Sequence, residues 1–351
     1  MLTEQVSENF PQVREEILVT KAREQVKDLF RPRPVIYWFD FLTSAFIGWG
    51  VFAMALNSPN LSFQQVLFVV ISGMALYRAV LFIHEIAHFK KGTFKVFRWV
   101  WNTVCGFPLM VPAFLYQSVH FDHHKQNFYG TEKDGEYFPF ALNNRRWIII
   151  HVLFSFLVPI IFLVRFSVLT PLSMINKRIR TFLMTRMSAL SIDFDYQRPE
   201  SSWKNSESWK VQEFFGCLTA WVFITSLLMG IIPALVLILW YCVTALIFMV
   251  NSVRTLAAHR YQNPEGNVVS YSTQMLDSVN ISGRGWMTPL WAPVGLRYHA
   301  THHLFPDLPY HALGKAHRRL IQDQGKNSLY AQTVCSGLLP ALNQLWKHAG
   351  S

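Results

Sequence analysis

The sequence has 351 residues, of which 51% are hydrophobic and 15% aromatic, and its formal net charge is +11. Its apolar residues stand in long runs, which is typical of membrane proteins, and its basic residues form several clusters, which excludes a single nucleic-acid-binding arm. The first 30 residues mix both charges and lead into no apolar core, so we expect a surface helix there and no cleavable signal peptide.

Two apolar stretches near the start of the chain are each long enough to cross a bilayer, which takes about 20 residues. They run over residues 36–56 and 65–83, and the polar sequence NSPNLS between them predicts a hairpin. A second hairpin is predicted from the apolar stretches 218–230 and 231–250, which are interrupted near Gly230 and Pro233.

Two further apolar segments, 97–116 and 147–169, contain internal Gly or Pro and are expected to dip into the membrane without crossing it. Neither hairpin tip carries Lys or Arg, whereas basic residues flank the first hairpin and occur five times in 165–186. The positive-inside rule therefore predicts that these flanks, both termini and the histidine-rich segments are cytoplasmic.

The predicted fold class is an all-α membrane protein with four transmembrane helices in two hairpins and a helical cytoplasmic cap. The predicted membrane domain covers residues 35–320. It follows a cytoplasmic N-terminal segment, 1–34, and precedes a cytoplasmic tail, 321–351.

Nine of the 13 histidines fall into four groups on the predicted cytoplasmic side. On a helix, positions i, i+3 and i+4 share one face, so each of the three groups with several histidines can direct two or three imidazoles at one centre. Nine imidazoles exceed the three protein ligands of a catalytic zinc and match two metal ions. The groups are HEIAH with His84 and His88, HFDHH with His120, His123 and His124, the single His259, and HATHH with His299, His302 and His303. The other four are interpreted as structural: His151, His311, His317 and His348.

In this order and topology the groups resemble the boxes HxxxH, HxxHH and HxxHH of the integral-membrane fatty acid desaturase and hydroxylase family. The sequence RYHATHHLFPDLPYHAL is similar to the third box and the tail that follows it, and the resemblance extends over roughly residues 36–320. His259 fits less closely, because some relatives carry an asparagine four residues before this histidine, where Thr255 stands here.

The resemblance implies that the nine histidines bind two Fe²⁺ ions, that O₂ is the co-substrate and that the substrate is an acyl chain. It favours desaturation of a fatty acid or acyl lipid. Hydroxylation, or oxidative decarboxylation of a free fatty acid to a terminal alkene, are alternatives for the same site. No catalytic residue beyond the metal ligands is implied.

Neutral imidazole ligands are usually oriented by a partner on their second nitrogen. Asp122, inside the second box, and Asp134, in TEKDGEY, are therefore candidates for this role, whereas Glu136 is interpreted at least as readily as a solvated loop acid.

The sequence contains no HPGG haem motif, no Fe–S cysteine run and no GxGxxG, so we expect a separate ferredoxin or cytochrome to supply electrons. A basic face could receive it, although a phospholipid surface would suit the same charges. Its residues are Arg178, Arg180, Lys315, Arg318 and Arg319.

Two other classes of function stay open. HEIAH also fits a membrane zinc protease with Glu85 as general base, but that interpretation leaves seven histidines without a role. A metal-transporting bundle is the other alternative, and it is disfavoured because transport sites lie near the bilayer midplane, whereas the nine histidines follow the spans.

Overall fold

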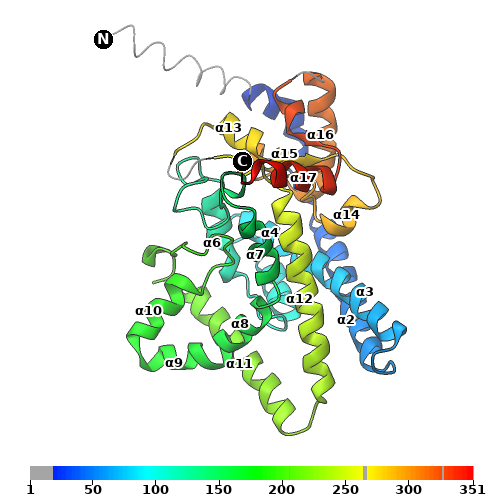
Figure 1. Ribbon diagram of the computed structural model, residues 1–351, viewed down its shortest axis with the longest axis vertical. Helices are drawn as coiled ribbons and strands as arrows, with labels where there is room; N and C mark the ends of the chain where they lie inside the picture. Colours follow the sequence, from blue (N-terminus) through cyan, green and yellow to red (C-terminus); the bar gives the residue numbers. More distant parts are fainter. Residues whose placement is uncertain (1–18, 205, 264–266, 326–327, 351) are drawn as a thin grey trace.

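The computed structural model describes residues 19–204, 206–263, 267–325 and 328–350. Residues 19–26 are helical, and the surface helix expected over the first 18 residues lies outside the described range. Helices form almost all of the regular secondary structure of the described residues, as predicted. One parallel pair of two-residue strands accompanies them, β1 (Asn280–Ile281) and β2 (Val334–Cys335). The molecule is elongated, with two long hairpins extending from one end and short helices gathered at the other (Figure 1).

The first hairpin consists of α2 (Pro34–Leu56) and α3 (Phe63–Val80), which continues after Leu81 into α4 (Phe82–His88). Small residues let the two helices approach closely, as is common in membranes. A Cβ atom added at Gly48 would lie 2.5 Å from the Leu76 side chain. The first predicted hairpin is therefore present.

The second hairpin consists of α11 (Glu207–Leu228) and α12 (Ala234–Leu256), and its turn contains Gly230 at φ +70. This positive φ favours glycine. The helix α11 begins 11 residues earlier than the predicted apolar stretch, because its first turns are polar and lie against α6 (Phe114–His123), where the Gln212 side chain accepts from the Phe114 N–H at 3.1 Å. The second hairpin is thus also present, with a longer first arm.

The expected count of four transmembrane helices is not confirmed, because five helices are long and apolar enough to cross a membrane. They are Pro34–Leu56, Phe63–His88, Val158–Ile175, Glu207–Leu228 and Ala234–Leu256. The additional candidate combines α8 (Val158–Val164), a π-helical turn (Arg165–Leu169) and α9 (Thr170–Ile175), and it follows α7 (Arg146–Phe154).

The candidate span Val158–Ile175 was not predicted because Arg165, inside it, was counted among the five basic residues that placed 165–186 on the cytoplasmic side. The Arg165 side chain is fully buried and its Nη2 donates to Glu213 at 3.2 Å, so this charge is paired inside the protein. A basic residue neutralised in this way carries little information about which side of a membrane a segment occupies.

Segment 97–116 breaks at its Gly and Pro residues, as expected. It contains α5 (Lys95–Trp101), a π-helical turn (Asn102–Gly106) and the start of α6. The Asn102 carboxamide accepts from the Ala113 N–H at 2.9 Å and so replaces a helical hydrogen bond across the break. The amphipathic helix α10 (Lys177–Arg186) lies beside α9 at the edge of the molecule (Figure 1).

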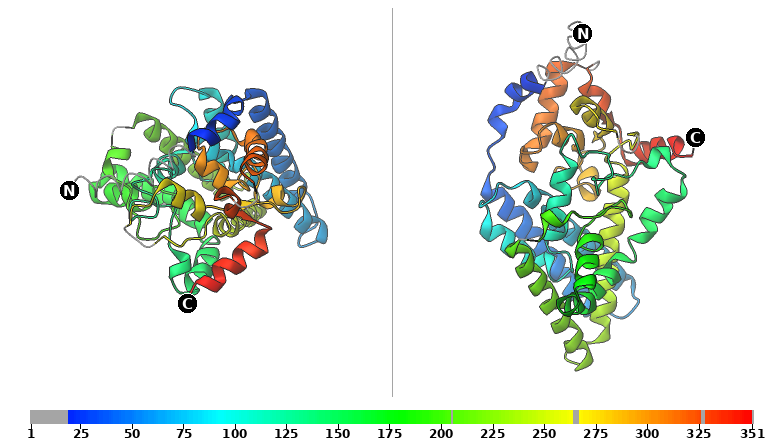
Figure 2. Two further views of the ribbon diagram at one scale, coloured as in Figure 1. Left: turned by 90° about the horizontal axis from the view of Figure 1, so that it is seen from above. Right: turned by 90° about the vertical axis from the view of Figure 1, so that its left-hand side faces the viewer.

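The cap at the other end is built from short helices, which the right-hand view of Figure 2 shows above the hairpins. They are α13 (Tyr271–Asp277), α14 (Thr288–Trp291), α15 (His299–Leu304), α16 (Tyr310–Gln324) and α17 (Leu338–His348).

Tyr310, at the start of α16, joins this cap to the first hairpin. Within the hairpin, Arg78 and Asp40 form a bidentate ion pair at 2.6 and 2.7 Å, and the Tyr310 hydroxyl donates to Asp40 at 2.9 Å. The cap is therefore fixed to the helices that precede the first histidine pair.

Candidate metal centre

Four separate elements bring the nine histidines together at the boundary between hairpins and cap. His84 and His88 lie one turn apart on α4, and HFDHH occupies the end of α6. HATHH forms α15, which begins at His299. His259 lies three residues after the end of α12, where it forms a bridge to Ser278, so it stands in a loop and not on the helix.

The ligand nitrogens form two groups, in each of which they lie within 4.8 Å of one another. His124 lies between the groups. Its Nε2 is 3.2 Å from that of His120 and 3.0 Å from that of His302, and its ring centroid is 4.4 Å from that of His303. One group consists of His84, His88, His120 and His302, and the other of His123, His259, His299 and His303.

The ring nitrogens of these histidines are arranged for metal ions rather than for hydrogen bonds with one another. Among the residues that the structure describes, neither ring nitrogen of His84 has a hydrogen-bond partner, and the same holds for Nε2 of His88 and Nδ1 of His302, all of them buried atoms. Buried polar atoms without partners are costly, and metal coordination would satisfy the lone pairs that converge here. Facing Nε2 pairs support the same interpretation, since those of His259 and His299 lie only 2.8 Å apart.

Electrostatics keep most of these rings neutral. Burial lowers the pKa of His259, His299 and His303, and neighbouring imidazoles lower it further. A neutral imidazole keeps the lone pair that a metal needs, and clusters of imidazoles suit iron, zinc, copper and nickel. The arrangement can therefore hold two transition-metal ions.

Of the two predicted orienting carboxylates, Asp122 and Asp134, only Asp134 accepts a hydrogen bond from a histidine of the two groups. It is fully buried and accepts from His123 Nδ1 at 2.8 Å. Burial lowers the pKa of His123, but Asp134, together with Glu136 and Asp277, raises this pKa above its usual value. Asp122 instead accepts from Lys125 Nζ at 2.6 Å, because its place on α6 turns it away from the histidine face. We do not retain Asp122 as an orienting residue.

Glu136, for which the sequence favoured a solvated loop acid at least as much as an orienting carboxylate, accepts from His120 Nδ1 at 2.9 Å and from the Tyr116 hydroxyl at 3.2 Å. Burial raises the pKa of Glu136 to about 8. Its position two residues after Asp134, in the loop that follows the second box, was the available signal.

Asp277 is a third orienting carboxylate, and no pattern in the sequence indicated it. The Tyr129 hydroxyl lies 2.9 Å from His259 Nδ1 and donates to Asp277 at 2.6 Å, so Asp277 acts on this histidine through the phenol. Such indirect contacts fix the ring orientation of a ligand. Asp277 lies 148 residues after Tyr129, which explains why no local pattern indicated the pair.

Glu85 has a structural environment rather than that of a protease base. Its Oε2 accepts from the Tyr37 hydroxyl at 2.6 Å and from the Tyr310 N–H at 3.2 Å, and the carboxylate is buried. Its other oxygen lies 3.6 Å from His84 Nδ1. The residue thus connects the first histidine pair to α2 and to the start of α16.

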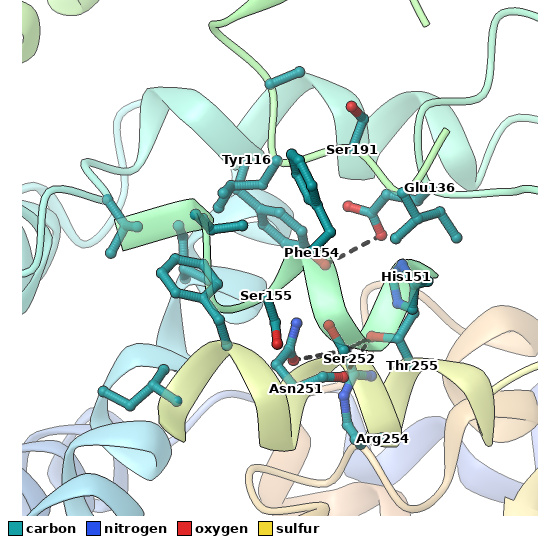
Figure 3. Close-up of a pocket in the computed structure, with 18 of the residues that line it drawn as sticks. Tyr116, Glu136, His151, Phe154, Ser155, Ser191, Asn251, Ser252, Arg254 and Thr255 are labelled. Carbon is teal, nitrogen blue, oxygen red and sulfur yellow. Dashed lines mark hydrogen bonds between the residues drawn. The ribbon is translucent and has the colours of Figure 1, made fainter. Parts of the chain in front are cut away.

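A cavity of about 340 Å³ opens beside the histidines, and His84, His259 and His299 lie in its wall. Figure 3 shows its polar part, where side chains of α12 face the end of α7, with Tyr116 and Glu136 on the opposite side. The polar α12 residues are Asn251, Ser252, Arg254 and Thr255. Apolar side chains, among them Phe162 and Phe248, form another part of the wall. His151, predicted to be structural, also lines the cavity.

The comparisons with known proteins agree with this geometry. A family model described as fatty acid desaturase matches residues 61–333, a range that contains all four histidine groups. A ceramide hydroxylase of Caulobacter vibrioides is 36% identical over 331 residues, which cover 94% of this chain and 93% of that relative. No solved structure matches the chain significantly.

Proposed function

The chain belongs to the fatty acid desaturase family, and on that premise we propose that it hydroxylates a long-chain N-acyl lipid of the ceramide type. As a member of the family it is a membrane-bound di-iron oxidoreductase that oxidises lipid chains. The protease alternative is therefore abandoned. The metal-transport alternative is abandoned for the same reason.

The observation that supports hydroxylation is the similarity to the ceramide hydroxylase, which extends over 94% of this chain. Desaturation was the reaction favoured by the histidine boxes alone, but these boxes are common to both reactions. Desaturation and oxidative decarboxylation of a free fatty acid remain alternative outcomes at the same site.

We propose that two Fe²⁺ ions bind to the nine histidines, four in each group and His124 between them. When bound, the ions would supply the activation of O₂ that attack on a C–H bond requires. Asp134, Glu136 and Asp277 would hold the imidazoles in the orientation that exposes their ligand nitrogens, the last of them through Tyr129.

The cavity beside the histidines would hold the lipid chain and limit access of water to the reacting carbon. We place the histidines and both termini on the cytoplasmic side, in keeping with the basic flanks of the hairpins. The proposed division into segments 1–34, 35–320 and 321–351 stays a prediction.

A separate ferredoxin or cytochrome is proposed as the electron donor. Two residues of the basic face that was predicted to receive it have partners within the chain: Arg180 pairs with Glu213 at 2.6 Å, and Arg319 donates to Asp28 at 2.9 Å. Figure 1 also places α10, which carries Arg178 and Arg180, far from α16, which carries Lys315, Arg318 and Arg319, so the predicted residues do not form one face. We propose that an acidic donor would dock at Lys315 and Arg318 on α16.

The test is incubation of the purified, iron-loaded protein with N-acylsphinganine, ¹⁸O₂ and a reducing system, followed by mass spectrometry of the lipid. Hydroxylation adds one labelled oxygen atom, whereas desaturation removes two hydrogen atoms and incorporates no label. A product without label would refute the proposed reaction. The double variant His302→Ala, His303→Ala should lose iron and product together.

A further inference from the structure

Arg254 is a positive charge placed in the wall of the cavity without an anionic partner. Its Nη2 donates to Asn251 Oδ1 at 3.1 Å and to Thr255 Oγ1 at 3.0 Å, both of which are neutral (Figure 3). Its Nε is buried without a hydrogen-bond partner. Among the described residues, no carboxylate forms an ion pair with it.

The carboxylate of Glu136, across the cavity from Arg254, already has other hydrogen-bond partners. Glu136 accepts from His120 and from Tyr116, and Figure 3 shows it on the opposite side of the cavity from Arg254. A guanidinium has five N–H donors, and Arg254 uses Nη2 for its contacts with Asn251 and Thr255, while the neutral Tyr77 hydroxyl is a further neighbour. Arg254 is half-buried and its contacts are all neutral, so an acceptor supplied by a ligand would stabilise the guanidinium.

The polar residues of α12 in the cavity wall, from Asn251 to Thr255, lie between the metal centre and the apolar part of the cavity. Along α12, Phe248 precedes Asn251 and Arg254, and His259 follows the end of the helix. A lipid oxygen held at Arg254 would therefore lie close to the histidines, while its hydrocarbon chain could occupy the apolar wall.

We propose that Arg254, held in place by Asn251 and Thr255, binds the carbonyl oxygen at the polar end of the acyl chain. The oxygen belongs to an amide or to a free carboxylate, since a guanidinium binds either. Binding it there directs oxidation to a carbon close to the carbonyl group rather than to the middle of the chain. This inference rests on the proposed function and specifies how its substrate is held.

The experiment measures lipid binding to the metal-loaded full chain in detergent without a reductant, so that no turnover occurs. The probes are N-hexadecanoylethanolamine and 2-(hexadecyloxy)ethanol, which match in chain length and differ mainly in the carbonyl-containing amide. Hexadecanoate is the third probe. The variants are Arg254→Gln, Arg254→Lys and, as a matched control, Arg178→Gln on the exposed surface of α10.

The wild-type protein should bind the amide about ten- to a hundredfold more tightly than the ether, as expected for one hydrogen bond to a charged donor. Arg254→Gln should reduce this preference to about threefold or less, Arg254→Lys should keep part of it, and Arg178→Gln should leave it unchanged. If the free acid is the natural ligand, Arg254→Gln should weaken hexadecanoate binding more than amide binding.

Equal binding of amide and ether by the wild type would overturn the inference, and so would a preference that survives in Arg254→Gln. If that variant does not fold, the wild-type comparison and Arg254→Lys decide the matter. Because binding is measured without turnover, an Arg254-dependent preference in a protein that forms no hydroxylated lipid would refute only the proposed function. Hydroxylation without any such preference would refute only the role of Arg254.

Discussion

Replacing Asp134 by Asn should weaken one metal group selectively. The carboxylate accepts from His123 Nδ1 at 2.8 Å, from the Gly130 N–H at 2.9 Å and from the Glu136 N–H at 3.0 Å, and both of its oxygens are used. An amide has only one acceptor oxygen, so the NH₂ group of Asn would face an N–H donor whichever way it turns.

The expected magnitude follows from these contacts. Losing a buried charge-assisted hydrogen bond costs about 1.5–3 kcal/mol, which corresponds to about ten- to a hundredfold in metal affinity. The loss should fall on the group that contains His123, His259, His299 and His303, because Asp134 contacts only the first of these and no member of the other group.

The assay is iron content by mass spectrometry after equilibration with increasing chelator concentrations. Asp134→Asn should pass through a state with about one iron per chain at concentrations where the wild type keeps about two. Asp122→Asn is the matched control, since this carboxylate is turned toward Lys125 and should leave the retention curve unchanged. Coincident curves for the two variants would refute the assignment of Asp134.

Two further predictions concern stability in detergent, measured by thermal unfolding. Gly48→Ala should lower the free energy of unfolding by about 1–3 kcal/mol, because its Cβ would meet Leu76 at 2.5 Å, whereas Gly50→Ala, with nothing within 4 Å, should be neutral or slightly stabilising. Equal effects would contradict the close helix contact. Asp40→Asn should cost about 1–3 kcal/mol by leaving the half-buried Arg78 unpaired, and adding Arg78→Gln should restore part of it. Additive losses would indicate that the ion pair contributes no coupling.

The features that the sequence predicted well are those with a short spacing. The histidines of HEIAH, HFDHH and HATHH lie on single turns of helix, so their common faces follow from helix geometry alone. The two hairpins follow equally from run length and turn residues, and both are present.

Features that depend on distant partners could not be predicted. Asp277 reaches His259 through Tyr129, and the position of Arg254 in a cavity depends on α7 and on the loop that carries Glu136. The fifth candidate span was missed for the same reason, since Arg165 is neutralised by a residue 48 positions later. Local patterns contain no information about such pairs.

The contacts of Tyr310 with the first hairpin have a consequence for biosynthesis. Its hydroxyl reaches Asp40 across 270 residues, and its N–H reaches Glu85 across 225. The hairpin and HEIAH therefore leave the ribosome long before their polar partners are made, and contacts between such distant residues form late. Assembly of the centre is thus a post-translational event, and a chain truncated before Tyr310 would insert its helices without completing the surroundings of its first two histidines.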